Sequence, residues 1–401
     1  MLSLDQIKDI SRQSPAKIVL LVLDGLGGLP RPETSKTELE TADTPNLDRL
    51  ASKGICGMSD PVSRGVTPGS APGHLALFGY DPLKFIVGRG ILEVLGIDFD
   101  VKKGDVAARG NFCTIDQRGL IVDRRAGRIP TEENAVLCKS LSDIVLDGAE
   151  LYVIPVKEHR FAAVFRGDEL SGDVTDSDPQ QVGLAPQTMV PLSPSAQKAA
   201  RLANEFVSKA KATLADHHPA NMVLLRGFSQ YPNLPTMADI YKLDAAAIAA
   251  YPMYRGLAKL VGMRILVTGA SIKEEFDTLV QHYANHDFFF VHVKRADSAG
   301  EDGNFDAKVH ILEELDELLP KIINLDPDVM VVSGDHSTPA LLKAHSWHPV
   351  PLILYSRWCR PDRVQEFSEL ACSSGALGRF PAVEVMPLAM ANALKLAKFG
   401  A

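Results

Sequence analysis

The sequence predicts an α/β fold: a doubly wound, mostly parallel sheet with a smaller α+β domain inserted into it. Three apolar runs carry this prediction, IVLLVL at 18–23, FFFVHV at 288–293 and VMVV at 329–332. Continuous runs of this kind are typical of strands that are buried on both faces of a parallel sheet. An amphipathic helical stretch at 306–324 separates two of these runs, and this alternation of strand and helix favours the α/β class.

The middle of the chain has a different pattern. Between 104 and 192 the sequence is rich in turn segments such as DQRGL, FRGDELSG and DSDPQQ, and YVIPV and RFAAVF are predicted to pair as hairpin strands. A helical stretch that begins near 193 then leads back to the strand MVLL. We therefore expect a core formed by 1–103 and 193–401, interrupted by an inserted lid domain at 104–192.

The composition excludes several classes of protein. The 401 residues are 46% hydrophobic, which is enough for a large buried core. The formal net charge is −8 and there is no long basic run, so we expect no nucleic-acid partner. No apolar run approaches the ~20 residues of a membrane helix, and the N-terminal segment lacks the apolar stretch of a signal peptide. We expect a cytoplasmic protein without a membrane partner.

The cysteines are widely spaced and contain no CxxC pair. This pattern fits neither a disulfide framework nor a zinc knuckle, so reduced and buried thiols are expected. The five residues are Cys56, Cys113, Cys138, Cys359 and Cys372.

The segment VTPGSAPGHLALFGYDP at 66–82 places one serine, Ser70, immediately before an apolar run. A turn would explain Gly69, Pro72 and Gly73, but it would not explain the serine. A serine on a sharp turn at the start of a helix is exposed and rigidly aimed, and it lies near backbone N–H groups that favour negative charge. Ser70 is therefore a candidate nucleophile.

Acidic residues follow all three predicted strands. The carboxyl ends of parallel strands share one edge of the sheet, where ligands bind, so Asp24, Asp297 and Asp335 are expected at one place. Carboxylates and imidazoles together suit divalent metals, and such a set can form the two-metal site of phosphoryl transfer. Taken singly, each residue also has a structural explanation as a helix cap, a turn or a solvated loop residue. The candidate set is Asp24, Asp297, Glu301, Asp302, Asp335, His336, His345 and His348.

Further motifs extend over nearly the whole chain: LVLDGLGG, TPNLDRLASKG at 44–54, GSAPGHLALFGYDP, GRG at 88–90, ARGNFCTID, DRRAGRI, EHR at 158–160, DSAGEDG, GDHSTP and HSWHPVP. As a set they resemble the archaeal-type branch of the cofactor-independent phosphoglycerate mutases, within the alkaline phosphatase superfamily. The resemblance implies an alkaline-phosphatase-like core that interconverts 3-phosphoglycerate and 2-phosphoglycerate in glycolysis and gluconeogenesis, without bisphosphoglycerate. The alternative is a metal-dependent phosphatase or phosphotransferase that acts on another small hydroxylated metabolite.

The same resemblance implies residue roles. Ser70 would be the nucleophile that is phosphorylated during the reaction. The implied metal ligands are Asp24, Ser70, Asp335 and His336 for one ion, and Asp297 and His345 for the other.

One position departs from the family pattern, because Glu301 stands where many such mutases carry histidine. Asp297 and Glu301 are spaced i, i+4, so a helical turn would place both on one face and let Glu301 act as a ligand. An added carboxylate makes the site richer in oxygen, so we expect two divalent ions with Mn²⁺ favoured and Mg²⁺, Co²⁺ or Zn²⁺ possible. In the alternative interpretation, Glu301 caps the following helix and Asp302 or water completes the shell.

Basic side chains of the insert are candidates for substrate binding. A mutase must hold the glycerate and exclude water while the phosphoryl group rests on serine, and a closing lid would do this. Arginine forks suit bidentate binding of phosphate and carboxylate, and a solvated charged hairpin is the alternative interpretation. The candidates in the insert are Arg124, Arg125, Arg128, His159 and Arg160. Arg226 and Arg255, which lie near the expected domain junction, are weaker candidates. The expected partner is a small phosphorylated hydroxy acid, and the sequence does not indicate an oligomeric state.

Overall fold

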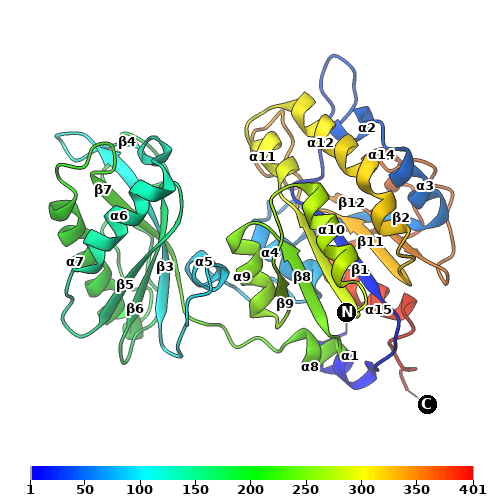
Figure 1. Ribbon diagram of the computed structural model, residues 1–401, viewed down its shortest axis with the longest axis horizontal. Helices are drawn as coiled ribbons and strands as arrows, with labels where there is room; N and C mark the ends of the chain where they lie inside the picture. The colour runs from blue at the N-terminus through cyan, green and yellow to red at the C-terminus, as the bar shows by residue number, and fades with distance from the viewer. Residues whose placement is uncertain (1, 401) are drawn as a thin grey trace. The chain divides into compact units, whose positions relative to one another are not determined.

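The three apolar runs form neighbouring parallel strands at the centre of an eight-stranded sheet, as predicted (Figure 1). They are β1 (Ile18–Leu23), β10 (Phe288–Val293) and β11 (Val329–Ser333), and every residue of the three is buried. In the register, Leu23 of β1 pairs with Val293 of β10, and Val22 pairs with Ser333 of β11. The three strands therefore end level with one another, and the segments that follow them start at the same edge.

The rest of this sheet is mixed. Its order is β13-β2-β12-β11-β1-β10-β8-β9, in which β12 runs antiparallel to both of its neighbours and all the other pairs are parallel. This is the doubly wound, mostly parallel sheet expected from the sequence. The additional strands are β2 (Ile55–Asp60), β8 (Ala245–Ala249), β9 (Arg264–Leu266), β12 (Val350–Ser356) and β13 (Gly378–Pro381).

Helices cover the large sheet, and the predicted helix at 306–324 is among them. It forms as α12 (Phe305–Leu318) and continues as α13 (Pro320–Ile323). Leu21 of β1 lies in one buried cluster with Phe276 of α10 and Leu312 of α12, so these two helices cover one face of the sheet. The other helices are α1 (Leu4–Ile10), α2 (Glu38–Thr41), α3 (Pro45–Lys53), α4 (Ser70–Leu77), α8 (Met237–Tyr241), α9 (Pro252–Leu260), α10 (Ile272–His282), α11 (Arg295–Glu301), α14 (Glu369–Cys372) and α15 (Val385–Asn392), with the 3₁₀ turn η3 (Ala382–Glu384).

A second, antiparallel sheet lies in the middle of the chain. Its order is β4-β3-β6-β5, with β7 also paired to β3, and the predicted hairpin forms as β5 and β6. The strands are β3 (Val106–Ile115), β4 (Ile121–Asp123), β5 (Glu150–Lys157), β6 (Arg160–Arg166) and β7 (Met222–Ser229). The helical segments are α5 (Arg89–Gly96), η1 (Ala126–Arg128), α6 (Thr131–Ser142), η2 (Pro194–Ala196) and α7 (Gln197–Thr213).

The computed structural model describes residues 2–400 and divides them into two compact units. We call them the core unit, which ends at Ile86 and resumes at Leu234, and the insert unit, Val87–Asn233. The insert unit is wider at both ends than the expected 104–192. Helix α5 packs on β3 and β7, and β7 is itself a strand of the second sheet.

Strand β7 explains why the expected boundary differs from the compact unit. Its run MVLL has the continuous apolar pattern of a core strand, but it pairs antiparallel with β3. Val223 and Leu225 lie in one buried cluster, whereas Met222 and Leu224 lie in another, so both faces of the strand are covered. A strand buried on both faces loses the polar alternation that usually marks an antiparallel sheet.

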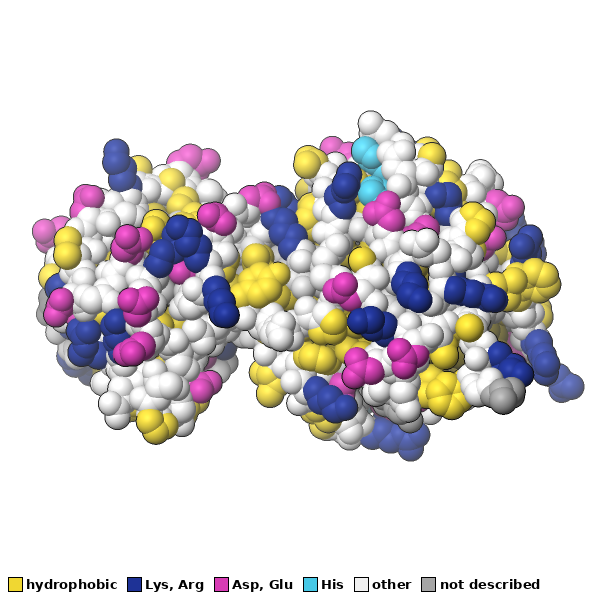
Figure 2. Space-filling view, turned by 90° about the horizontal axis from the view of Figure 1, so that it is seen from below, with side chains coloured by type: hydrophobic (Ala, Val, Ile, Leu, Met, Phe, Trp, Pro, Cys, Tyr) yellow, Lys and Arg dark blue, Asp and Glu magenta, His cyan; other side chains and the backbone are white. Residues whose placement is uncertain are grey.

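Two further expectations concern the surface and the thiols. On the face that Figure 2 shows, Lys and Arg side chains are interspersed with Asp and Glu. No helix within residues 2–400 combines the length and apolar character needed to cross a membrane. All five cysteines are free thiols, and four of them are buried; Cys359 is partly exposed.

Candidate active site

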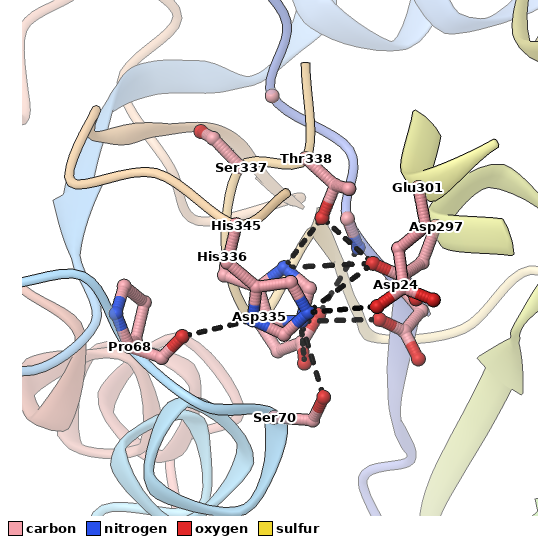
Figure 3. Close-up of polar contacts among 12 residues, drawn as sticks. Asp24, Pro68, Ser70, Asp297, Glu301, Asp335, His336, Ser337, Thr338 and His345 are labelled. Atoms are coloured by element: carbon pink, nitrogen blue, oxygen red, sulfur yellow. Dashed lines mark hydrogen bonds and ion pairs between the residues drawn. The ribbon is translucent and has the colours of Figure 1, made fainter. Parts of the chain in front are cut away.

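The strand ends bring the predicted acids together at one edge of the large sheet (Figure 3). Asp24 directly follows β1, Asp335 comes two residues after β11, and Asp297 lies in the first turn of α11, which follows β10. All three carboxylates are buried, with at most 1% of each residue exposed. The expectation that separate strands deliver these acids to one place is confirmed.

The first ligand group consists of Asp24, Asp335 and His336, and all three residues are fully buried. His336 Nε2 lies 3.3 Å from Asp24 Oδ1 and 3.1 Å from Asp335 Oδ2. The Ser70 hydroxyl lies 3.2 Å from the same nitrogen. These are the four residues that the resemblance implied for one metal ion.

The second ligand group consists of Asp297, His345 and, again, His336. His345 Nε2 lies 3.5 Å from Asp297 Oδ1, and His345 Nδ1 lies 2.9 Å from the Pro68 carbonyl oxygen. Because a carbonyl can only accept, His345 donates through Nδ1 and turns Nε2 toward the aspartate. The imidazole rings of His336 and His345 stack with 3.6 Å between their centroids, so His336 belongs to both groups, which the sequence did not indicate.

The first group has the character of a cation site. Asp24 Oδ1 and Asp335 Oδ2 are buried and accept no hydrogen bond, and both face His336 Nε2. His74 Nδ1 lies 3.1 Å from Asp335 Oδ2, but its hydrogen is directed to the Ser70 carbonyl oxygen at 2.8 Å. Buried carboxylate oxygens without a donor are costly, and a bound cation would satisfy them. Carboxylate and imidazole ligands suit first-row divalent metals, so the residues fit such an ion.

Three donors hold the other oxygen of Asp24. Oδ2 accepts a short hydrogen bond from the Tyr254 hydroxyl and lies 3.2 Å from both His292 Nε2 and Lys294 Nζ. Burial alone would raise the pKa of Asp24, but Lys294 and the hydrogen bond from His292 outweigh it and hold the pKa well below its usual value. Asp24 therefore stays ionised, with one oxygen anchored and the other directed at the ligand group.

Lys294 also connects the two ligand groups. Its ammonium forms a short ion pair with Asp297 Oδ2 in addition to its contact with Asp24 Oδ2. Residues Lys294, His292 and Tyr254 were not among the candidates from the sequence. A signal existed for the first two, because they lie at the end of the strand FFFVHV, between the apolar run and Asp297.

Ser70 is the first residue of α4, which has Gly69 as its N-cap. A Cβ atom on Gly73 would lie 2.1 Å from the Asp335 carbonyl oxygen, so only glycine lets the helix approach the loop that carries Asp335 and His336. The glycine that seemed to serve a turn thus serves close packing. Ser70 is 9% exposed, which makes it more buried than the sequence suggested.

Glu301 lies at the edge of the second group. As expected, it shares one helix with Asp297, and its Oε1 lies 3.9 Å from His345 Nε2. Its side chain is 56% exposed. The alternative role as a cap is wrong, because Asn304 caps α12 by accepting from the Ala307 N–H. His348 contacts Ser346 and does not join either ligand group among the described residues.

The basic candidates of the insert unit fall into two sets. Arg124 makes a bidentate ion pair with buried Asp178, at 3.0 and 2.6 Å, and Arg226 lies 3.6 Å from the same carboxylate. Burial raises the pKa of Asp178, but the hydrogen bonds from Arg124 and from the backbone outweigh it and lower the pKa. These two arginines are therefore engaged within the unit.

The second set surrounds His159, which is 1% exposed. Burial and the neighbouring cations Arg160, Arg109, Arg125 and Arg128 together lower the pKa of His159 to about 3, with burial as the largest cause. A neutral imidazole amid several guanidinium groups gives this region a strong preference for anions. The remaining candidate, Arg255, lies in α9 of the core unit.

Comparisons with known proteins agree with this geometry. The sequence profile of the 2,3-bisphosphoglycerate-independent phosphoglycerate mutase family matches residues 51–221. A relative from Thermotoga petrophila named "Probable 2,3-bisphosphoglycerate-independent phosphoglycerate mutase" is 50% identical over 397 residues, which is 98% of each chain. A relative of the same name from Aquifex aeolicus is 48% identical over 99% of this chain and 100% of its own.

Solved structures give the same result. A protein from Pyrococcus horikoshii is 30% identical and has a TM-score of 0.84, and the match covers 98% of this chain and 100% of that protein. The cofactor-independent phosphoglycerate mutase of Thermoplasma acidophilum is 32% identical, has a TM-score of 0.69 and is likewise covered in full by 94% of this chain. The chain therefore belongs to the 2,3-bisphosphoglycerate-independent phosphoglycerate mutase family.

Proposed function

We propose that this member of the family interconverts 3-phosphoglycerate and 2-phosphoglycerate through a phosphoserine on Ser70. The observation that carries the proposal is the position of the Ser70 hydroxyl, at the start of α4 and 3.2 Å from His336 Nε2. Two buried carboxylate oxygens without hydrogen bonds face the same nitrogen. A hydroxyl beside a site for cations is suited to attack a phosphoryl group.

Two divalent ions fit the ligand atoms, with Mn²⁺ favoured. Asp24, Asp335 and His336 would hold one ion with Ser70, and Asp297 and His345 would hold the other. When bound, such ions lower the pKa of a coordinated hydroxyl and neutralise charge on the transferring phosphoryl group. Glu301 would contribute a further carboxylate to the second ion, because its Oε1 lies 3.9 Å from His345 Nε2.

The proposed reaction consists of two transfers of the phosphoryl group, first to Ser70 and then back to the glycerate. Ser70 Oγ attacks phosphorus, and its bond to phosphorus forms as the bond to the C3 oxygen of glycerate breaks. The proton that Ser70 gives up is balanced by the proton that the glycerate oxygen takes. The C2 hydroxyl of the same glycerate next attacks the phosphoserine, which releases 2-phosphoglycerate and restores Ser70.

The insert unit would bind the anionic substrate and retain the glycerate between the two transfers. Arg125, Arg128 and Arg160, which surround His159, are the preferred donors to phosphate or carboxylate. Arg124 and Arg226 are tied to Asp178, so we assign them the support of this region rather than the first contact with substrate.

The experiment that tests the proposal is incubation with 3-phosphoglycerate followed by intact-mass measurement and peptide mapping. We expect phosphate on Ser70 in the wild type, none in Ser70→Ala, and wild-type labelling in the control Ser52→Ala, whose partly exposed hydroxyl donates to the Arg49 carbonyl. Phosphate release is measured in parallel, because steady hydrolysis without 2-phosphoglycerate would favour the phosphatase alternative. Substantial mutase activity in Ser70→Ala would contradict the proposed nucleophile.

A further inference from the structure

The side chain of Thr338 lies between His336 and Asp297, which belong to the two ligand groups (Figure 3). It is fully buried, and its hydroxyl lies 2.7 Å from Asp297 Oδ1 and 2.9 Å from His336 Nδ1. Asp297 belongs to the second ligand group, whereas His336 is shared by both. A single hydroxyl therefore contacts ligands of both groups, on the side of His336 that faces away from Ser70.

The hydrogen-bond geometry of these three groups fixes one hydrogen on His336. The Thr338 hydroxyl donates to Asp297 Oδ1, 2.7 Å away. The hydroxyl has no second hydrogen and can only accept from His336. His336 Nδ1 therefore carries a hydrogen, and Nε2 is the ring nitrogen that faces Asp24 Oδ1, Asp335 Oδ2 and Ser70.

We propose that Thr338 is a positioning residue that holds His336 in the Nδ1–H tautomer and couples its orientation to that of Asp297. The proposal rests on the two-cation centre described above. In this arrangement the proton chain runs from His336 through Thr338 to Asp297, so the ligand shared by the two groups and the carboxylate of the second group are oriented together. Partners of this kind tune the metal affinity of the ligands they touch.

The surroundings of Thr338 hold it rigidly. Its N–H donates to the Gly27 carbonyl at 3.0 Å, and the buried Lys308 ammonium donates to the carbonyls of both Thr338 and Gly27, each at 3.0 Å. Two glycines leave room for it: a Cβ atom on Gly25 would lie 2.7 Å from the Thr338 hydroxyl, and one on Gly300 would lie 2.2 Å from its carbonyl oxygen. The loops after β1 and β11 and helix α11 thus pack closely around the backbone and side chain of Thr338.

The first test is the tautomer itself. In metal-free protein labelled with ¹⁵N-histidine, the ring resonances of His336 are assigned by their absence in His336→Gln. We expect a hydrogen on Nδ1 in the wild type. A ring whose Nδ1 carries no hydrogen would overturn the proposal, and this result requires neither a bound metal nor mutase activity.

The second test compares variants by calorimetric titration with Mn²⁺. Thr338→Val keeps the shape but loses the hydroxyl, and we expect metal binding to weaken by about 10–100-fold, whereas Thr338→Ser should stay within about threefold of wild type. Ser337→Ala is the matched control, because the hydroxyl of the neighbouring Ser337 donates to the His348 carbonyl rather than to a proposed ligand side chain. Equal dissociation constants in Thr338→Val and wild type would overturn the proposal.

The two tests separate this proposal from the proposed function. Failure of wild-type protein to bind Mn²⁺ would refute the cation centre, and the tautomer would still decide the role of Thr338. If Thr338→Val does not fold, the proposal is tested by the wild-type tautomer and by Mn²⁺ binding to Thr338→Ser. Mn²⁺ binding to Thr338→Ser that is more than tenfold weaker than in the wild type would contradict the proposal.

Discussion

Replacing Lys294 by methionine removes the ammonium that joins the carboxylates of the two ligand groups. Lys294 Nζ lies 3.2 Å from Asp24 Oδ2 and forms a closer ion pair with Asp297 Oδ2. Burial lowers the pKa of His336, so this imidazole is neutral near pH 7 and adds no positive charge. In Lys294→Met, the buried carboxylates would thus face one another without the lysine cation.

The expected loss of stability is set by these distances. Two unit charges 3.2 Å apart interact by about 5 kcal/mol at an effective dielectric constant of about 20. Removing one partner of a buried pair costs about 3–5 kcal/mol, and the lower value is appropriate because 28% of the Lys294 side chain is exposed. For a unit of this size, about 3 kcal/mol corresponds to a fall in Tm of roughly 6–12 °C.

The assay is thermal unfolding in excess chelator and in saturating Mn²⁺. We expect the full loss in chelator and most of it to disappear with Mn²⁺, because a bound cation replaces the missing charge and stabilises the folded state. Lys84→Met is the control, since the Lys84 side chain is 74% exposed and should change Tm little. An equal loss of Tm in both conditions, or no loss in chelator, would refute the role of Lys294 as the counter-charge of the site.

Three further predictions concern the insert, the second ligand group and a remote carboxyl. Arg125→Ala or Arg128→Ala should raise KM or divert phosphoserine to hydrolysis, whereas Arg118→Ala should not, because the Arg118 side chain is 78% exposed. Steady-state kinetics with a parallel phosphate-release assay test this, and equal behaviour of all three variants would contradict the prediction. Glu301→Ala should lose part of its metal, and Glu301→His should retain metal with a preference shifted toward Zn²⁺ or Co²⁺. Elemental analysis measures the metal content. Two equivalents of metal in both the wild type and Glu301→Ala, together with equal activity, would remove Glu301 from the site. Burial raises the pKa of Glu275 from 4.5 to about 9, so between these pH values the folded state holds a proton that the unfolded state lacks, and folding stability falls as pH rises. Glu275→Gln cannot ionise, so its Tm should exceed that of the wild type by more at pH 8 than at pH 5. An equal difference in Tm at both pH values would contradict the raised pKa.

The sequence predicted the large sheet and its acidic edge because both depend on local patterns. A continuous apolar run identifies a buried strand, and neighbouring parallel strands deliver the residues beyond their carboxyl ends to one edge of the sheet. Asp24, Asp297 and Asp335 needed no knowledge of distant contacts, and the structure brings them together as expected.

Other features depended on contacts that a sequence pattern does not contain. The antiparallel partner of β7 is β3, more than a hundred residues earlier, so the apolar run MVLL could equally have belonged to the core unit. The partner of Arg124 is Asp178, which stands 54 residues away and has no distinctive motif. Tyr254 reaches Asp24 from a helix that lies 230 residues further along the chain.

The role of each carboxylate oxygen was equally beyond the sequence, and it separates the residues that hold a cation from those that prepare the site. Asp24 Oδ2 receives Tyr254, His292 and Lys294, while Oδ1 receives no hydrogen bond. Asp297 differs because both of its oxygens are held: Lys294 contacts Oδ2, and Thr338 donates to Oδ1, which also lies 3.5 Å from His345. An aspartate anchored through one oxygen loses little rotational freedom when the other binds an ion, which lowers the entropic cost of binding. The donors on the outer oxygens are therefore as much a part of the metal chemistry as the ligands themselves.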